Sequence, residues 1–274
     1  ADMTEAEFVR EVLSGRSPAP QYFAQNARLN KSGYESFDQV LERAKRPLEP
    51  LAFARVAREA DTLILDVRSP AEFAAGHLPG AIFIGLDGSF APWVGALLPD
   101  LQQSILLVAP EGRAEEAITR LARVGYDRVR GYLAGGMAAW EAVDQPVARV
   151  SSISAARLAE ELEQGAVAQV LDVRRHTEFL SQHLLVAQNF PLDYIQGNWS
   201  KLDPERRYHL HCAGGYRSMI AASILQARGI AKVVNVEGGW KAIASTTAPQ
   251  SAYQCPSELQ ADTLDRALAA ALDF

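Results

Sequence analysis

The chain has only two cysteines, Cys212 and Cys255, among its 274 residues. Two thiols are too few for a disulfide framework or a four-thiolate metal site, although a single bridge between them stays open. Histidine is also scarce, with five in the chain, and no H-x-H-x-D-H or C-x-x-C pattern occurs. We therefore predict no metal ion and no other cofactor.

Long apolar runs and basic clusters are also missing. No run approaches the length that crosses a membrane, lysine and arginine form no cluster, and the formal net charge is −6. These absences argue against a membrane or nucleic acid as partner. No secretory signal is visible at the start, which opens with alanine rather than methionine. We therefore expect a globular, cytoplasmic protein.

What the sequence does contain is an internal repeat. Residues 65–68 (Leu-Asp-Val-Arg) return as residues 171–174, and a following Glu-Phe pair and histidine return at the same spacing of 106. Further on, Arg113 recurs 104 residues later as Arg217, and a Gly-Gly pair recurs at 238–239. Since each copy is about one hundred residues long, the repeated unit is a whole domain.

Each copy alternates short apolar runs with helical periodicity, which predicts an α/β fold. We expect two tandem domains, each a mostly parallel sheet with helices on both faces. The strands expected in the first copy are residues 63–67, 81–84, 104–109 and 130–134, with a helix at 115–124. The second copy has expected strands at 169–173, 208–212 and 232–236, with a helix at 217–228.

Four segments follow from this pattern. They are an N-terminal extension (1–47), a first domain (48–148), a second domain (149–248) and a C-terminal tail (249–274). The extension holds a polar stretch at 25–35 and a short amphipathic run near 37–44, and the tail ends in an Ala/Leu-rich helical pattern.

The candidate site is the string YHLHCAGGYRS at residues 208–218. A strand ends at Cys212, a glycine-bearing loop follows, and a helix begins near Arg217, where open α/β sheets bind ligands. Glycines let the loop curl so that its N–H groups aim inward and form an anion-binding nest. The helix N-terminus and Arg217 add positive charge, and these surroundings favour a thiolate or an anionic persulfide. The residues expected to line this cradle are Ala213, Gly214, Gly215, Tyr216 and Ser218, the last as a helix cap or a hydrogen-bond donor to the sulfur.

Together, the Asp-Val-Arg strand end with its glutamate and histidine, the Cys-x-x-Gly-x-Arg loop and the later Gly-Gly-Trp resemble the rhodanese superfamily. The resemblance extends over residues 48–248, once in each copy. It implies that Cys212, assisted by Arg217, accepts a sulfane sulfur as a persulfide and passes it to a thiol or cyanide. It also places Asp172 and Arg174 near the site, where we expect them to brace the loop rather than react.

Two other chemistries compete for the same residues. Cysteine-dependent phosphatases use a Cys-x5-Arg loop, whereas Cys212 to Arg217 is Cys-x4-Arg, a smaller ring of amides that suits a sulfur atom better than a phosphate. His209 and His211 share one face of the expected strand, but a metal site needs a further ligand nearby, so we interpret them as packing or hydrogen-bonding residues.

The first copy lacks the nucleophile. Cys212 corresponds to Val108, or to Ala109 if the register slips, and Pro110 removes an N–H from the nest. Acidic residues also stand where an anion would bind. We expect this domain to be catalytically silent and to serve in packing, in holding a partner domain or in shaping the substrate entrance. A Gly- and aromatic-rich segment at 85–93 is either a contact surface or ordinary core.

A closer resemblance concerns the layout. The N-terminal stretch, from residues 8–12 through 21–23 to 29–31, and the tail around Cys255 resemble parts of bacterial proteins that fuse a metallo-β-lactamase-like persulfide dioxygenase to rhodanese domains. The chain is then a fragment of such a protein, or it works alone or with a separate dioxygenase partner. The resemblance also adds glutathione-type persulfides to thiosulfate as expected substrates. The metal-binding motif is absent, so dioxygenase activity cannot reside in these residues.

Two hypotheses stay open. In the first, the chain is a sulfurtransferase with Cys212 as nucleophile. In the second, it is a non-catalytic interaction module in which Cys212 reports redox or sulfide status. Cys255 is either an inert free thiol or a partner that takes sulfur from Cys212 or forms a disulfide with it.

Overall fold

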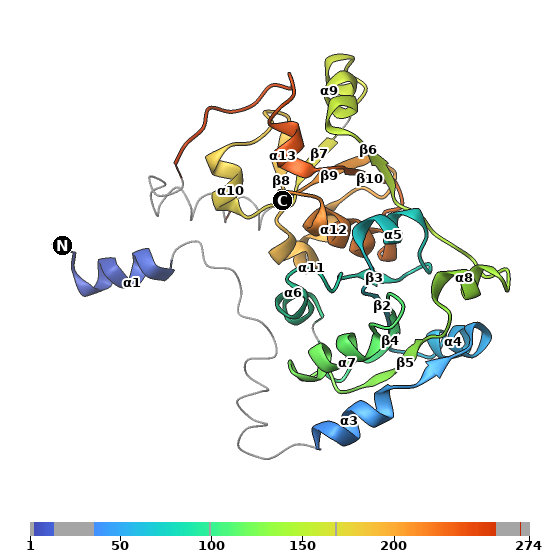
Figure 1. The fold of residues 1–274 in the computed structure, drawn as a ribbon. Coiled ribbons are helices and arrows are strands. Elements are labelled where there is room, and N and C mark those ends of the chain that lie inside the picture. Colours follow the sequence, from blue (N-terminus) through green and yellow to red (C-terminus); the bar gives the residue numbers. More distant parts are fainter. Residues whose placement is uncertain (1–2, 14–35, 99, 168, 256–268, 270–274) are drawn as a thin grey trace. The chain divides into compact units, whose positions relative to one another are not determined.

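The computed structural model describes residues 3–13, 36–98, 100–167, 169–255 and 269 (Figure 1). The chain divides into two compact units, one of residues 19–150 and the other of residues 151–274 together with 1–18. Helix α1 (Glu5–Leu13) therefore belongs to the same unit as the second domain. Within the described residues, no helix has the length and apolar character that crossing a membrane requires.

The first domain contains a five-stranded sheet in the order β1-β5-β4-β2-β3, and all of these strand pairs are parallel. Its elements are α3 (Phe37–Ala44), β1 (Pro47–Leu48), α4 (Pro50–Ala57), β2 (Thr62–Asp66), α5 (Pro70–Ala75), β3 (Ile82–Phe83), α6 (Phe90–Leu97), β4 (Ser104–Val108), α7 (Ala114–Ala122), β5 (Val129–Leu133) and α8 (Gly136–Glu141).

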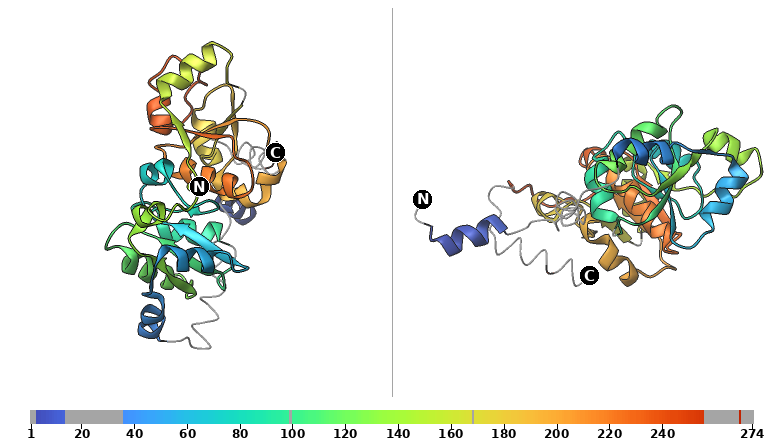
Figure 2. Two further views of the ribbon diagram at one scale, coloured as in Figure 1. Left: turned by 90° about the vertical axis from the view of Figure 1, so that its right-hand side faces the viewer. Right: turned by 90° about the horizontal axis from the view of Figure 1, so that it is seen from below.

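The second domain repeats the arrangement, with strand order β6-β10-β9-β7-β8 and parallel pairing. Its elements are β6 (Ser151–Ile153), α9 (Ala155–Glu163), β7 (Gln169–Asp172), α10 (His176–Ser181), β8 (Ala187–Asn189), the 3-10 turns η1 (Leu192–Tyr194) and η2 (Trp199–Lys201), α11 (Ile195–Asn198), β9 (Tyr208–His211), α12 (Tyr216–Ala227), β10 (Val233–Val236) and α13 (Gly239–Ile243). Helices flank each sheet (Figure 2). The predicted fold, two α/β domains with parallel sheets, is confirmed.

The central strands explain why the sequence folds this way. Residues 105–108 of β4 are all fully buried, as expected for a parallel strand that is covered by helices on both faces. In the second domain, β9 is also buried along its whole length, but two of its four core positions are histidines. The parallel sheet places the carboxyl end of β9, and therefore Cys212, at the edge where loops can form a site.

Two segments outside the predicted domain limits pack onto the domains. Helix α3, placed in the extension by the sequence, buries Val40 and Ala44 and contacts α7 and β5. The start of the predicted tail runs against the loop after α10, where Leu184 forms an antiparallel bridge with Gln250. In the first domain the bridge between His77 and Ala148 is the counterpart. The polar stretch at 25–35 and the helical pattern predicted for the end of the tail lie outside the described residues, residue 269 excepted.

Candidate active site

Cys212 follows β9 directly and is 1% exposed. Its thiol sulfur lies 3.1 Å from the backbone nitrogen of Gly215, which donates a hydrogen bond to it. Helix α12 begins at Tyr216, one residue before the predicted start, and Gly215 is its N-cap. The sulfur therefore sits at the N-terminus of a 12-residue helix, where N–H groups without intrahelical partners stabilise negative charge.

The two loop glycines have different roles. Gly215 has a φ of +104°, in the region that L-residues with a side chain rarely adopt. Gly214 has no such φ, and a Cβ built on it would meet no atom within 4 Å. Only Gly215 is required by the backbone conformation of the cradle.

We therefore expect Gly215→Ala to destabilise the second domain by about 1–2 kcal/mol, the usual cost of a left-handed residue that carries a Cβ. Gly214→Ala is the matched control and should leave the free energy of unfolding unchanged or raise it slightly. Urea unfolding followed by tryptophan fluorescence measures both. Equal destabilisation by the two substitutions would contradict this account of the loop.

Backbone N–H groups at the N-terminus of α13 donate hydrogen bonds to the cysteine loop. Trp240 N donates to the carbonyl oxygen of Cys212 at 2.6 Å, and Lys241 N donates to that of Ala213 at 3.1 Å. Gly239, with a φ of +55°, lies so close that a Cβ would stand 2.4 Å from the Cys212 carbonyl oxygen. These residues were not predicted as part of the site, although the repeated Gly-Gly pair was a signal for them.

Arg217, which we predicted to add positive charge to the cradle, also has an acidic partner. Its guanidinium makes a two-pronged ion pair with the Glu178 carboxylate, with N–O distances of 2.6 and 2.7 Å. Burial alone would raise the pKa of Glu178, but the hydrogen bonds and charge of Arg217 hold it below the ordinary value. Burial likewise opposes the charge on Arg217, and Glu178 outweighs it and raises the pKa of that guanidinium. Glu178, seen only as a member of the repeat, thus fixes the start of α12 to α10.

Ser218 is buried in the first turn of α12. Its hydroxyl lies 2.7 Å from Oδ1 of Asn235 and 3.1 Å from the carbonyl oxygen of Gly215, and both are acceptors. Neither predicted role holds, because Gly215 is the N-cap and the acceptors within reach of the single hydroxyl hydrogen are these oxygens, of which Asn235 Oδ1 is the nearer. Ser218 instead ties the helix start to β10.

Asp172 and Arg174 form a buried ion pair of 2.6 Å at the end of β7. Arg174 also donates to the Gln182 carbonyl oxygen and lies over the Trp240 ring, 4.6 Å from its centroid. The first domain repeats this arrangement, with a 2.6 Å pair between Asp66 and Arg68. Because it recurs where the cysteine is missing, the pair serves the fold of both domains.

His209 and His211 are buried on β9. Burial lowers the pKa of both imidazoles, so they are neutral near pH 7. His211 Nε2 lies 3.7 Å from the Asp172 carboxylate, and His209 Nε2 lies 3.6 Å from that of Glu161. Among the described residues no three His, Cys, Asp or Glu side chains gather as metal ligands.

The sheet register decides which residue of the first domain replaces Cys212. Asp172 of β7 pairs with His211, and its counterpart Asp66 pairs with Val108. Ala109, the second of the two sequence candidates, therefore occupies the cysteine position. Arg113 follows four residues later, whereas Arg217 follows Cys212 by five, so this loop is one residue shorter.

The two cysteines do not form a disulfide with each other in the structure. Cys212 is buried, whereas Cys255 is partly exposed. The chain just before Cys255 is tied to the end of α10, since Gln254 N donates to the Ser181 carbonyl oxygen and Ser181 Oγ donates to that of Gln254.

Comparison with known proteins identifies the repeat. The rhodanese-like domain family matches residues 51–143 and again residues 154–246. The chain is 34% identical over 74 residues to the uncharacterized protein YqhL of Bacillus subtilis, which spans 27% of this chain and 59% of that protein. It is 30% identical over 93 residues to a sulfurtransferase of Allochromatium vinosum, and this match covers 34% of this chain and 84% of that protein. A crystal structure of a rhodanese-related protein from Thermoplasma volcanium is 31% identical with a TM-score of 0.34, covering 37% of this chain and 97% of that one.

Proposed function

Because the chain belongs to the rhodanese-like domain family, with two copies in tandem, we propose that it is a sulfurtransferase that carries a sulfane sulfur on Cys212. The observation that carries this proposal is the position of the Cys212 sulfur, 3.1 Å from the Gly215 N–H at the start of α12. The name of the Allochromatium vinosum relative supports the same reaction class.

The proposed reaction has two displacements at sulfur. The Cys212 thiolate attacks the outer sulfur of thiosulfate or of a glutathione-type persulfide, the S–S bond of the donor breaks, and sulfite or a thiolate leaves with the bonding electron pair. A thiolate or cyanide acceptor then attacks the terminal sulfur of the Cys212 persulfide. The new S–S or C–S bond forms, the Cys212 thiolate is regenerated, and no net oxidant or reductant is required.

The cradle stabilises the negative charge in both states. The Gly215 N–H contacts the sulfur, and the carbonyl oxygens of Cys212 and Ala213 accept hydrogen bonds from the backbone of α13. Ala213, Gly214 and Tyr216 complete the loop as backbone donors to the anion. Arg217 fixes the start of the helix through its pair with Glu178. Arg174, paired with Asp172, lies over the Trp240 ring, and the Trp240 backbone N–H donates to the Cys212 carbonyl oxygen.

We propose that the first domain is catalytically silent, because Ala109 replaces the cysteine and Pro110 has no N–H to donate. We also propose a metallo-β-lactamase-like dioxygenase as partner, on the resemblance of residues 8–12, in α1, to the end of such a domain. The rest of that N-terminal stretch, at 21–31, lies outside the described residues. Two cysteines without a disulfide between them suit the reducing conditions of the cytoplasm, where we place the protein.

Mass spectrometry of the intact chain after brief exposure to each donor tests the function. We expect one sulfur atom to be added at Cys212 and to be lost, with stoichiometric thiocyanate, when cyanide follows. Steady-state thiocyanate formation from thiosulfate and from glutathione persulfide then ranks the donors. Addition of sulfur without turnover would favour the sensor hypothesis, and no addition with either donor would exclude sulfur transfer by this chain.

A further inference from the structure

The first domain holds a pocket of about 570 Å³ at the place where the second domain has its cysteine cradle. The pocket lies between the loop at 109–114, the end of β5 at Tyr132 and Leu133, and the start of α8 at 135–136. Its volume is in the range of small-molecule sites. Loss of the nucleophile has therefore left this edge of the sheet open rather than filled.

The pocket exists because the first domain lacks the contact that joins α13 to the cysteine loop in the second domain. There, Gly239 packs on the Cys212 carbonyl and α13 donates two hydrogen bonds to the cysteine loop. At Gly136, the counterpart of Gly239, a Cβ would meet no atom within 4 Å. Within the described part of the chain, no backbone hydrogen bond joins α8 to the loop at 109–113.

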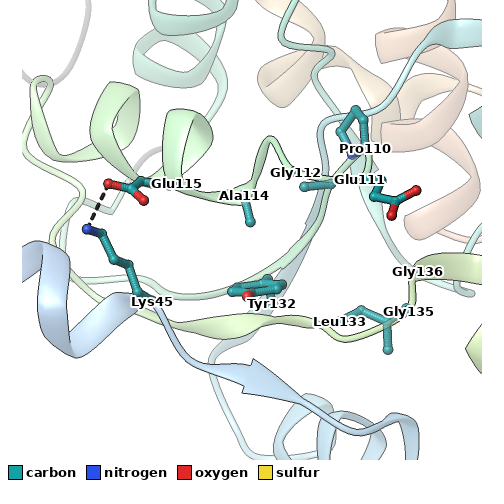
Figure 3. Close-up of a pocket in the computed structure, with 11 residues that line it drawn as sticks. Lys45, Pro110, Glu111, Gly112, Ala114, Glu115, Tyr132, Leu133, Gly135 and Gly136 are labelled. Atoms are coloured by element: carbon teal, nitrogen blue, oxygen red, sulfur yellow. Dashed lines mark ion pairs between the residues drawn. The ribbon is translucent and has the colours of Figure 1, made fainter.

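The charges in this pocket differ from those of an anion cradle. Figure 3 shows Lys45 and Glu115 at one end, Glu111 at the other, and the Tyr132 ring between them. Lys45 and Glu115 form an ion pair of 2.7 Å, whereas the described residues offer no ion-pair or hydrogen-bond partner to the exposed Glu111 carboxylate. The pocket thus offers a carboxylate at one end and, at the other, the Lys45 ammonium group, which also pairs with Glu115 at 2.7 Å and with Glu42 at 3.6 Å.

A small anion such as thiosulfate does not match this pattern, because Glu111 repels it and Pro110 supplies no N–H. A zwitterion has a positive group for the Glu111 end of the pocket and a negative group for the Lys45 end. An ammonium group of the ligand pairs with Glu111, its carboxylate reaches Lys45, and its body lies on the Tyr132 ring. Ala109 has no reactive atom, so a molecule held there is bound without being transformed.

We propose that the first domain is a binding site for an amino-acid or short-peptide zwitterion, the class that includes the low-molecular-weight thiols that accept or deliver sulfur. The identity of the class rests on the pocket alone, whereas its link to thiols rests on the proposed function.

S-methylglutathione is a suitable probe, because it has no free thiol and cannot enter the transfer reaction. Isothermal titration of the whole chain should show saturable binding, and Glu111→Gln should weaken it roughly tenfold, the usual effect of losing one charge-assisted hydrogen bond. N-acetylation of the probe should weaken binding to the wild type by a similar factor. Glu111→Gln should then cause no further loss, because both changes remove the same contact.

Glu49→Gln is the control, since this exposed side chain lies outside the pocket and makes no capping hydrogen bond. It should bind the probe as the wild type does. Absence of saturable binding, or equal affinity of Glu111→Gln and wild type, would overturn the proposal. Because the probe cannot transfer sulfur, either result is independent of whether Cys212 turns over.

Discussion

Cys212→Ser should abolish thiocyanate formation from thiosulfate and from glutathione persulfide, with a loss of about 10³-fold or more, as for other enzymatic nucleophiles. The serine hydroxyl is almost the same size as the thiol but does not ionise near neutral pH, and it cannot form a persulfide. The fold should be retained, because the Gly215 N–H that contacts the sulfur can donate to the serine oxygen instead.

Cys255→Ser is the matched control for this substitution. The two cysteines form no disulfide with each other, and nothing in the proposed reaction uses Cys255, so its removal should leave the rate unchanged. Turnover that survives Cys212→Ser would refute the assignment of the nucleophile. A loss on Cys255→Ser, or a 212–255 disulfide found by mass spectrometry after mild oxidation, would instead support the relay hypothesis for the tail.

The second large effect is expected at Gly239. Gly239→Ala should lower kcat/KM by about 100-fold, because its Cβ would stand 2.4 Å from the Cys212 carbonyl oxygen and must push the loop aside. Displacements of about 1 Å at a reacting group have effects of this size. The measurement is the thiocyanate assay, with circular dichroism to establish that the variant is folded.

Gly136→Ala separates the steric effect from backbone strain. Gly136 has a φ of +58° and Gly239 one of +55°, so an alanine is about equally strained at either position. Only at Gly239 does the Cβ also meet the cysteine loop, and only there should the transfer of sulfur from thiosulfate to cyanide fall, since neither of these small ligands matches the pocket that Gly136 lines. If the two variants have the same activity, the loop does not depend on its contact with α13.

The repeat in the sequence was enough to predict the fold and the candidate nucleophile. The apolar runs of β4 and the Leu-Asp-Val-Arg strand ends indicate buried parallel strands through local side-chain pattern alone. The glycines and Arg217 after Cys212 mark a strand–loop–helix junction in the same local way. These features depend on neighbouring residues, so the sequence carries them directly.

The partners of the site were decided only by the tertiary structure. Glu178 is 39 residues from Arg217 in the sequence, yet their side chains are 2.6 Å apart because α10 packs beside the start of α12. The support of the loop by α13 and the choice of Ala109 over Val108 likewise depend on how strands align across the sheet. Spacing along the chain does not encode such distances.

The positions of the basic residues also differ between the sequence and the folded structure. No cluster of lysine or arginine is visible in the sequence, but Arg43, Arg46, Arg128 and Arg130 together line a pocket of about 610 Å³ in the first domain. The sequence determined the composition, the repeat and the position of the reactive thiol. Only the folded sheets decided which distant charges meet and which loop stays open, because side-chain contacts follow strand order and register rather than position in the chain.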